Sequence, residues 1–195
     1  MLVATATAAD VASAVRHRVG DIDTRRLLKL VYYCQAWHLA WYGVPLFDDE
    51  LEAWQQGPVV RSVWKHVPPP ASPEDLGLSE QAQSVLQHVL SVYGRLGGLE
   101  LSKITHIEFP YVAARGGLPP DAPSSEPLDH DFMREYYRRL PLAPERAAEY
   151  AAANASLEGL EVTAELAGRL REVADGTRTD DDAVADLLAA RFGRH

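Results

Sequence analysis

One segment near the N-terminus constrains the fold of this chain more than any other. Between Thr24 and Tyr42 the apolar and aromatic side chains recur at spacings of three and four residues, and Gly43 ends the run. The members of this series are Leu27, Leu30, Val31, Cys34, Trp37, His38 and Trp41. Because this spacing places them on one face of a helix, the segment predicts a core helix that ends at the glycine.

Helical patterns also cover much of the chain after this segment. They predict helices over residues 58–67, 79–96 and 129–140, and two short helical pieces within 101–117 that are broken by Pro110. Pro58 is expected to open the first of these helices, because proline fits the first turn. Residues 46–60 mix strand-like alternation with a Gly57–Pro58 break, which favours a short strand or turn. Residues 118–127 predict an exposed loop.

The composition shifts to Ala and Glu after Pro144, which marks a domain boundary. Two more helices are expected beyond it, over residues 163–174 and 180–192. We therefore predict a mainly α protein made of an N-terminal extension (1–21), a compact helical domain with a short β element (22–141) and a small helical C-terminal segment (142–195).

Composition and charge exclude several classes of protein. The single cysteine, Cys34, allows neither an internal disulfide nor a thiolate-rich metal site, and no signal peptide or membrane-spanning stretch is recognised. These features predict a soluble cytoplasmic protein without a membrane partner. The net charge of -9 opposes binding to a phosphate backbone, although Arg134, Arg138 and Arg139 lie close together on a predicted helix. Nucleic acid is therefore not the expected partner.

No residue pattern predicts an enzyme, a metal site or a bound cofactor. The clustered tryptophans Trp37, Trp41, Trp54 and Trp64 suit either a ligand cage or a core, and helical spacing favours the core. Three histidines, His38, His66 and His106, are candidates for a shared metal. His106 and Glu108 form an H-x-E pair, but the cysteines that zinc deaminases need are absent. We predict no catalytic residues.

Many residues between Ile22 and Leu140 resemble the Panacea domain of SocA-like antitoxins. In chain order they are Lys29, Tyr32, Tyr33, Gln35, Trp37, His38, Pro45, Leu46, Phe47, Glu52, Ala53, Trp54, Gly57, Pro58, Val59, Leu101, Ser102, Thr105, His106, Glu108, Pro110, Ala114 and Arg115. Tyr111 stands where the family usually has Trp. The resemblance implies a mainly helical domain that neutralises a toxin by direct binding. We interpret six polar residues of this region as a buried hydrogen-bonded network: Gln35, His38, Gln55, Thr105, His106 and Glu108.

The tail from about Pro144 resembles VbhA-type antitoxins, small three-helix proteins that inhibit Fic-domain toxins. Their inhibition motif is Ser or Thr, three residues, then Glu-Gly, and this chain has Asn154, Glu158 and Gly159 at the matching positions. A carboxylate in the last turn before a glycine is disfavoured by the helix dipole by about 0.3 to 1 kcal/mol. This position independently suggests that Glu158 is presented to a partner.

The second resemblance implies a mechanism in which the Glu158 carboxylate pairs with the toxin arginine that holds the γ-phosphate of ATP. ATP is then excluded or misaligned, and transfer of AMP to a target stops. Leu157 and Leu160 are the expected apolar anchors, and Ala151 and Ala155 are expected to let the helix approach the toxin closely.

The residues leave other functions open. The chain is also consistent with a Panacea antitoxin that neutralises an unrelated toxin through its globular surface, or that delivers the toxin to a protease as an adaptor. A DNA-binding autorepressor is a third hypothesis, and an enzyme acting through His106 and Glu108 is the last. The cognate toxin, of Fic type, remains the expected partner.

Overall fold

The computed structural model describes residues 6–72 and 77–140. Its helices are α1 (Ala8–Val19), α2 (Thr24–Tyr42), α3 (Arg61–Lys65), α4 (Glu80–Tyr93), α5 (Gly98–Thr105), α6 (Phe109–Arg115) and α7 (His130–Arg138). Strands β1 (Leu51–Trp54) and β2 (Gly57–Val60) form an antiparallel hairpin. The prediction of a mainly helical domain with a short β element is confirmed for this part of the chain.

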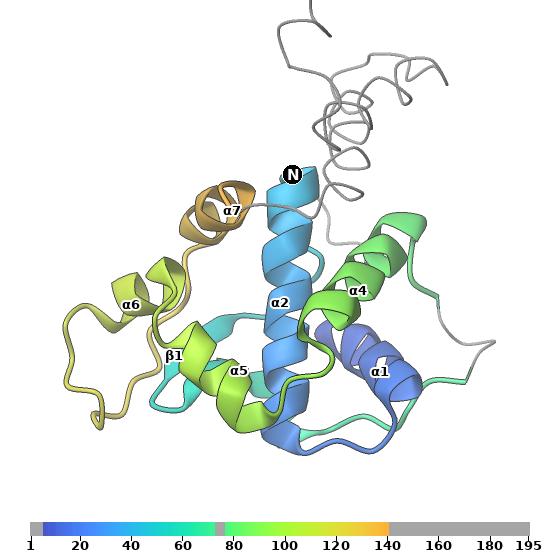
Figure 1. The fold of residues 1–195 in the computed structure, drawn as a ribbon, viewed down its shortest axis with the longest axis horizontal. Helices are drawn as coiled ribbons and strands as arrows, with labels where there is room; N and C mark the ends of the chain where they lie inside the picture. Colours follow the sequence, from blue (N-terminus) through green and yellow to red (C-terminus); the bar gives the residue numbers. More distant parts are fainter. Residues whose placement is uncertain (1–5, 73–76, 141–195) are drawn as a thin grey trace, which may run out of the picture. The chain divides into compact units, whose positions relative to one another are not determined.

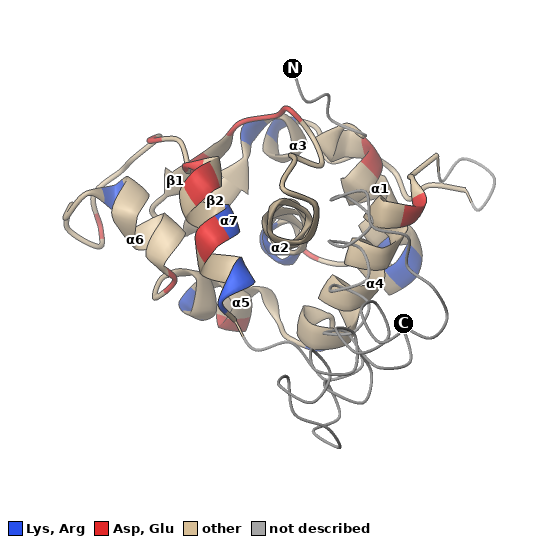
Figure 2. Cartoon of the chain, turned by 90° about the horizontal axis from the view of Figure 1, so that it is seen from above, with Lys and Arg blue, Asp and Glu red and all other residues tan. Residues whose placement is uncertain are grey.

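Helix α2 is the centre of the domain, as the sequence predicts. The Asp23 side chain accepts the Arg26 N–H at its start, and Gly43 ends it with a left-handed φ of 70°. Every residue from Leu27 to Trp41 is buried. A helix buried on all sides needs neighbours all round it, and Figure 2, which looks along α2, shows the other elements arranged in a ring about it.

Helices α1, α4, α5 and α7 and strand β2 all contact α2 (Figure 1). The N-terminal helix α1 begins with a reciprocal cap between Thr7 and Asp10. It buries small or branched side chains: Ala8, Val11, Ala12, Ala14 and Val15. Residues 8–19, which the sequence analysis places in an extension, thus pack on the central helix. No helix within the described residues is long and apolar enough to cross a membrane.

The prediction that Pro58 opens a helix is wrong, because Pro58 lies in β2 and α3 begins at Arg61. Pro58 pairs with Ala53 across the hairpin. The Ala53 N–H points away from β2 and donates to the Glu126 carbonyl at 2.8 Å. A residue at such a pair needs no N–H of its own, so proline is tolerated inside this strand.

Two other boundaries differ from the sequence prediction. The break between α5 and α6 lies at residues 106–108, and Pro110 sits in the first turn of α6, where its missing N–H costs nothing. Helix α4 stops at Tyr93, three residues earlier than expected. The loop 118–127 is largely exposed, as predicted, and its end runs beside β1, where Leu128 N–H donates to the Leu51 carbonyl.

Candidate functional site

The core contains a carboxylate, that of Glu108, whose side chain is buried between α2 and α7. Tyr33 donates its hydroxyl to Oε1 at 3.1 Å, and Tyr32 and Tyr137 donate to Oε2 at 3.3 and 2.8 Å. Burial raises the pKa of Glu108, and the hydrogen bonds from Tyr137, Tyr33 and Tyr32 oppose that shift. The carboxylate therefore joins three helices through hydroxyl donors rather than through a cation.

Aromatic contacts extend this cluster to α4. The Tyr33 ring stacks on Tyr93 with centroids 3.8 Å apart and planes at 8°. Trp37 donates its indole N–H to the Tyr93 hydroxyl at 3.3 Å and contacts Tyr137 edge-on at 5.4 Å. Burial raises the pKa of Tyr93 to about 12, so this hydroxyl stays protonated at neutral pH. These residues hold α2, α4 and α7 together.

A second set of side chains holds the turn of the β-hairpin through its backbone carbonyls. Tyr111 donates to the Trp54 carbonyl at 2.7 Å, and Nε2 of His106 lies 2.9 Å from the Gln55 carbonyl. The next carbonyls are also occupied: Ser102 donates to Gln56 at 3.1 Å and Lys29 Nζ donates to Pro58 at 2.9 Å. We call these four donors, Tyr111, His106, Ser102 and Lys29, the turn clamp.

Gly57 fits the turn clamp because it has no side chain. A Cβ there would lie 2.7 Å from Lys29 Cε and 2.9 Å from Thr105 Oγ1, and the residue has a φ of 98°. Lys29 is buried, and its burial, followed by the charge of Arg25, lowers its pKa to about 7. The close fit of Gly57, Lys29 and Thr105 explains why these residue types occur together.

A third set of contacts holds residues 44–47 against α2. Gln35 Oε1 accepts the N–H groups of Leu46 and Phe47 at 2.8 and 3.2 Å, and its Nε2 donates to the Phe47 carbonyl at 3.0 Å. His38 Nδ1 lies 2.8 Å from the Val44 carbonyl. The polar residues of the Panacea-like pattern thus form three separate sets of contacts, and of those predicted to be buried, Gln55 is exposed and His106 half-buried.

The histidines do not assemble a metal site in the part of the chain that the structure describes. No cluster of three or more His, Cys, Asp or Glu side chains there is arranged to hold an ion. His38 and His106 instead face different backbone carbonyls. Both ring nitrogens of His106 face carbonyl oxygens: Nδ1 lies 2.5 Å from that of Ser102, and Nε2 faces that of Gln55.

The tryptophans divide between the core and a surface pocket. Trp37 and Trp41 are buried, as the core interpretation predicts, but Trp64 is 50% exposed and Trp54 is half-buried. The rings of Trp54 and Trp64 meet at 4.9 Å and 67°. They border a pocket of about 360 Å³, which is lined by Thr24, Arg25, Leu28, Lys29, Trp54, Gln55, Gln56, Val59 and Trp64. The core interpretation is therefore wrong for Trp64.

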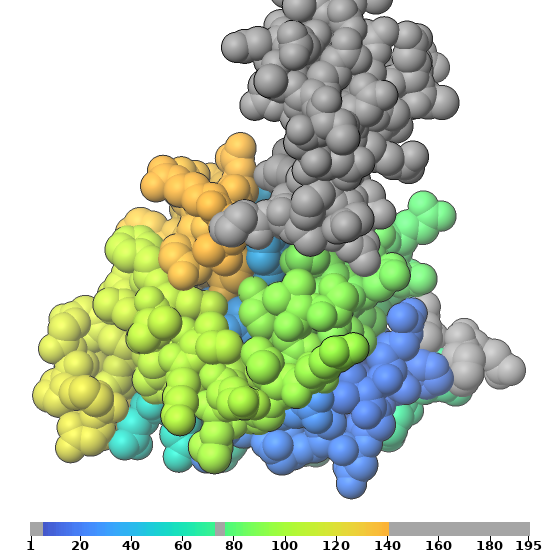
Figure 3. Space-filling view, in the orientation of Figure 1, coloured from blue at the N-terminus to red at the C-terminus, as the bar shows by residue number. Residues whose placement is uncertain are grey.

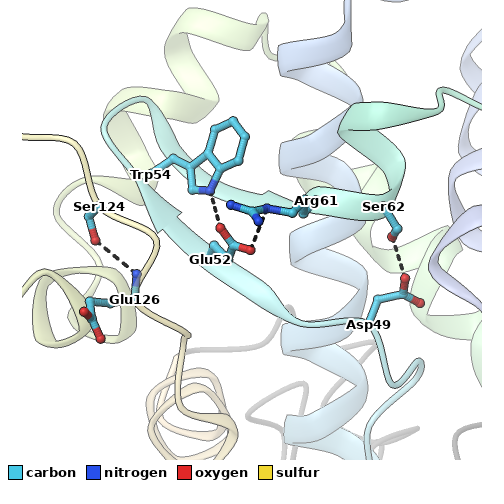
Figure 4. A network of polar contacts seen from close by, with 7 residues as sticks. All are labelled: Asp49, Glu52, Trp54, Arg61, Ser62, Ser124 and Glu126. Carbon is cyan, nitrogen blue, oxygen red and sulfur yellow. Dashed lines mark hydrogen bonds and ion pairs between the residues drawn. The ribbon is translucent and has the colours of Figure 1, made fainter.

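Trp54 is fixed on the other side by a buried carboxylate. Figure 4 shows Glu52 between the Trp54 indole and the Arg61 guanidinium. Glu52 accepts the Trp54 N–H at 2.7 Å and pairs with Arg61 at 3.0 Å. The Arg61 guanidinium lies 5.9 Å from the Trp54 ring centroid. The indole is held in one orientation at the edge of the pocket.

A second exposed surface lies over α6 and α7, which are in contact (Figure 3). The rings of Phe109 and Phe132 meet at 5.4 Å although each side chain is about half exposed, and Ile107 and Val112 are exposed near them in sequence. Of the arginines on the last described turns, Arg139 pairs with Glu135, and Arg134 pairs with Asp131. These pairs weaken the case for a basic nucleic-acid face on α7.

The predicted toxin-inhibiting residues lie outside the described residues. These are Ala151, Asn154, Ala155, Leu157, Glu158, Gly159 and Leu160. Within the described part, the sequence analysis missed the roles of Arg25, Lys29 and Tyr137. Lys29 lies outside the apolar series of α2, and the polar partners of Lys29 and Tyr137 come from distant segments, so no local pattern could have named these roles.

No curated protein and no solved structure matches the chain. One family model matches, from α2 to the first turn of α6, and the match includes Glu108, the Gln35 contacts and Lys29, Ser102 and His106 of the turn clamp. Its description is antitoxin SocA-like, Panacea domain, and the match covers residues 27–110.

Proposed function

We propose that this protein is the antitoxin of a bacterial toxin–antitoxin pair and acts by binding a cognate protein toxin in the cytoplasm, with no catalysis of its own. The observation that carries the proposal is the match of residues 27–110 to an antitoxin domain. The geometry supports it, because the polar residues of that domain are occupied in holding helices and a turn in place.

We further propose that the toxin is a Fic-type enzyme that transfers AMP, and that Glu158 blocks productive binding of ATP. This step is supported by the sequence alone, through Asn154, Glu158 and Gly159. A carboxylate that forms a bidentate pair with an arginine competes directly with a phosphate for the same guanidinium. Leu157, Leu160, Ala151 and Ala155 would then lie against the toxin.

The test is transfer of labelled AMP by the toxin encoded next to this chain, purified with the full-length protein. Wild-type protein should keep the toxin silent, and Glu158→Gln should release labelling because the amide no longer pairs with the arginine. Glu161→Gln is the matched control, since it removes the same charge three residues away. If both variants silence the toxin equally, Glu158 is not the inhibitory group.

A second candidate function is neutralisation of an unrelated toxin through the globular surface of the Panacea domain, directly or by delivery to a protease. The exposed aromatic pair of Phe109 and Phe132 favours it, because exposed apolar patches mark sites of protein interaction. Toxin inhibition that survives Glu158→Gln and is lost with Phe132→Ser would support this function over the first.

A further inference from the structure

The pocket beside the start of α2 has the form of a site for a large apolar side chain. Its walls include the indoles of Trp54 and Trp64, whose planes meet at 67°, and its apolar lining is completed by Leu28 and Val59. A volume of about 360 Å³ is within the usual range of ligand pockets. Trp64 leaves half of its surface in water, and tryptophan is among the residues that contribute most when an interface covers them.

The same pocket carries positive charge in an acidic protein. Arg25 and Lys29 line it, whereas its lining residues, all from the described part of the chain, include no carboxylate. Arg25 contacts the Gln56 amide oxygen at 2.8 Å. By contrast, the neighbouring Arg61 is neutralised by Glu52. An anion that enters the pocket would meet the Arg25 guanidinium with no carboxylate among the lining residues to compete for it.

The pocket is also held rigid before anything binds. Its rim at Trp54, Gln55 and Gln56 is the turn whose carbonyls are occupied by the turn clamp. The Trp54 indole is fixed by Glu52. A site ordered in advance loses less conformational entropy on binding.

We propose that this pocket binds an apolar side chain followed closely by a carboxylate, presented by an exposed segment of the partner toxin. The indoles receive the apolar group, and Arg25 receives the carboxylate. The inference rests on the proposed antitoxin function and names the surface that meets the toxin. A nucleic acid also offers rings and anions, but the net charge of -9 disfavours a polyanionic strand.

The first experiment titrates the full-length protein with N-acetyl-phenylalanine and follows the four indole N–H signals by NMR, assigned with single Trp→Phe variants. The signals of Trp54 and Trp64 should move, and those of the buried Trp37 and Trp41 should not. The uncharged amide of the same probe should bind about tenfold more weakly. Arg25→Gln should remove most of that preference, whereas the exposed Arg95→Gln should keep it.

Three results would overturn the proposal: no movement of the Trp54 and Trp64 signals, equal affinity for the acid and the amide, or tighter binding of an oligothymidylate than of the toxin. The second experiment measures the affinity of the adjacent gene's toxin by calorimetry. Trp64→Ser should weaken it at least about tenfold, while Val92→Ser, which also removes a half-exposed apolar side chain, should leave it nearly unchanged.

The two proposals fail in different ways. If wild-type protein binds the toxin and Trp64→Ser binds it equally well, the pocket is not the docking surface while the antitoxin function stands. Loss of binding in Phe132→Ser alone would move the docking surface to α6 and α7. If wild-type protein does not bind the toxin, the antitoxin function fails and the docking proposal fails with it.

Discussion

Two of the charged side chains buried in this domain, Glu108 and Lys29, are accommodated by the fold in different ways. Glu108 is surrounded by three tyrosine hydroxyls that donate to it. Lys29 has one carbonyl acceptor, that of Pro58, and burial lowers its pKa to about 7. A buried carboxylate is thus supplied with donors, whereas the buried amine is brought close to its neutral form. The comparison shows two ways of reducing the cost of a buried charge.

The largest loss of stability is expected when the Glu108 carboxylate, which accepts from three tyrosine hydroxyls, is removed. Glu108→Leu leaves Tyr32, Tyr33 and Tyr137 without that acceptor in the core, and should reduce the free energy of unfolding by about 3 kcal/mol or more. Glu108→Gln keeps one acceptor oxygen and should cost about 1 to 2 kcal/mol. Urea unfolding of both variants measures the difference. Equal losses would mean that the hydroxyls do not depend on this side chain.

Around Lys29, the tightest packing is against Gly57. Gly57→Ala should cost about 2 to 3 kcal/mol, because the new Cβ meets Lys29 and Thr105 and the backbone has a positive φ. Gly43→Ala is the matched control: its φ is 70°, but nothing lies within 4 Å of the added carbon. That variant should cost only about 1 to 2 kcal/mol. If the two glycines are equally sensitive in urea unfolding, the turn clamp is looser than the distances imply.

Whether the sequence predicts a contact of a buried charge depends on how far apart the two partners lie along the chain. The burial of α2 follows from local spacing, and Gly43 marks its end. The partners of the buried charges do not follow from any local pattern. Tyr137 reaches Glu108 from α7, and the Pro58 carbonyl reaches Lys29 from the hairpin. Such pairings become visible only when the strands and helices are placed in space.

The wrong prediction for Pro58 also arose because its contacts come from a distant segment. Proline before a helical pattern is ordinary evidence for a helix start. What allows it in β2 is that Ala53, its partner, donates to Glu126 from the other edge of β1. The exposure of Trp64 was missed for a related reason, since its spacing alone does not show that α3 lies at the rim of a pocket.

The two charges should give stability opposite dependences on pH. The folded pKa of Glu108 is raised, so its contribution is present below the unfolded value of 4.5 and is lost as pH rises through the folded value. The folded pKa of Lys29 is lowered from 10.5 to about 7, so its contribution is complete above 10.5 and is lost as pH falls to about 7.

Unfolding free energies of wild type, Glu108→Gln and Lys29→Met across this range separate the two contributions. As pH rises from about 7 to 10.5, the unfolding free energy of wild type should increase relative to that of Lys29→Met. As pH rises above 4.5, the unfolding free energy of wild type should decrease relative to that of Glu108→Gln. A flat difference for either variant would show that its parent side chain titrates alike in the folded and unfolded chains.

The smallest effect is expected at an exposed pair, where water already solvates both charges. Glu135 and Arg139 lie one turn apart at the end of α7 with contacting atoms 2.5 Å apart, but both side chains are more than half exposed. Glu135→Gln should change the free energy of unfolding by less than about 0.5 kcal/mol, and moderate salt should remove what difference there is. The contrast with Glu108→Gln, which makes the same chemical change in the core, isolates burial as the cause. Similar losses in the two variants would show that the hydroxyls around Glu108 serve it no better than water does.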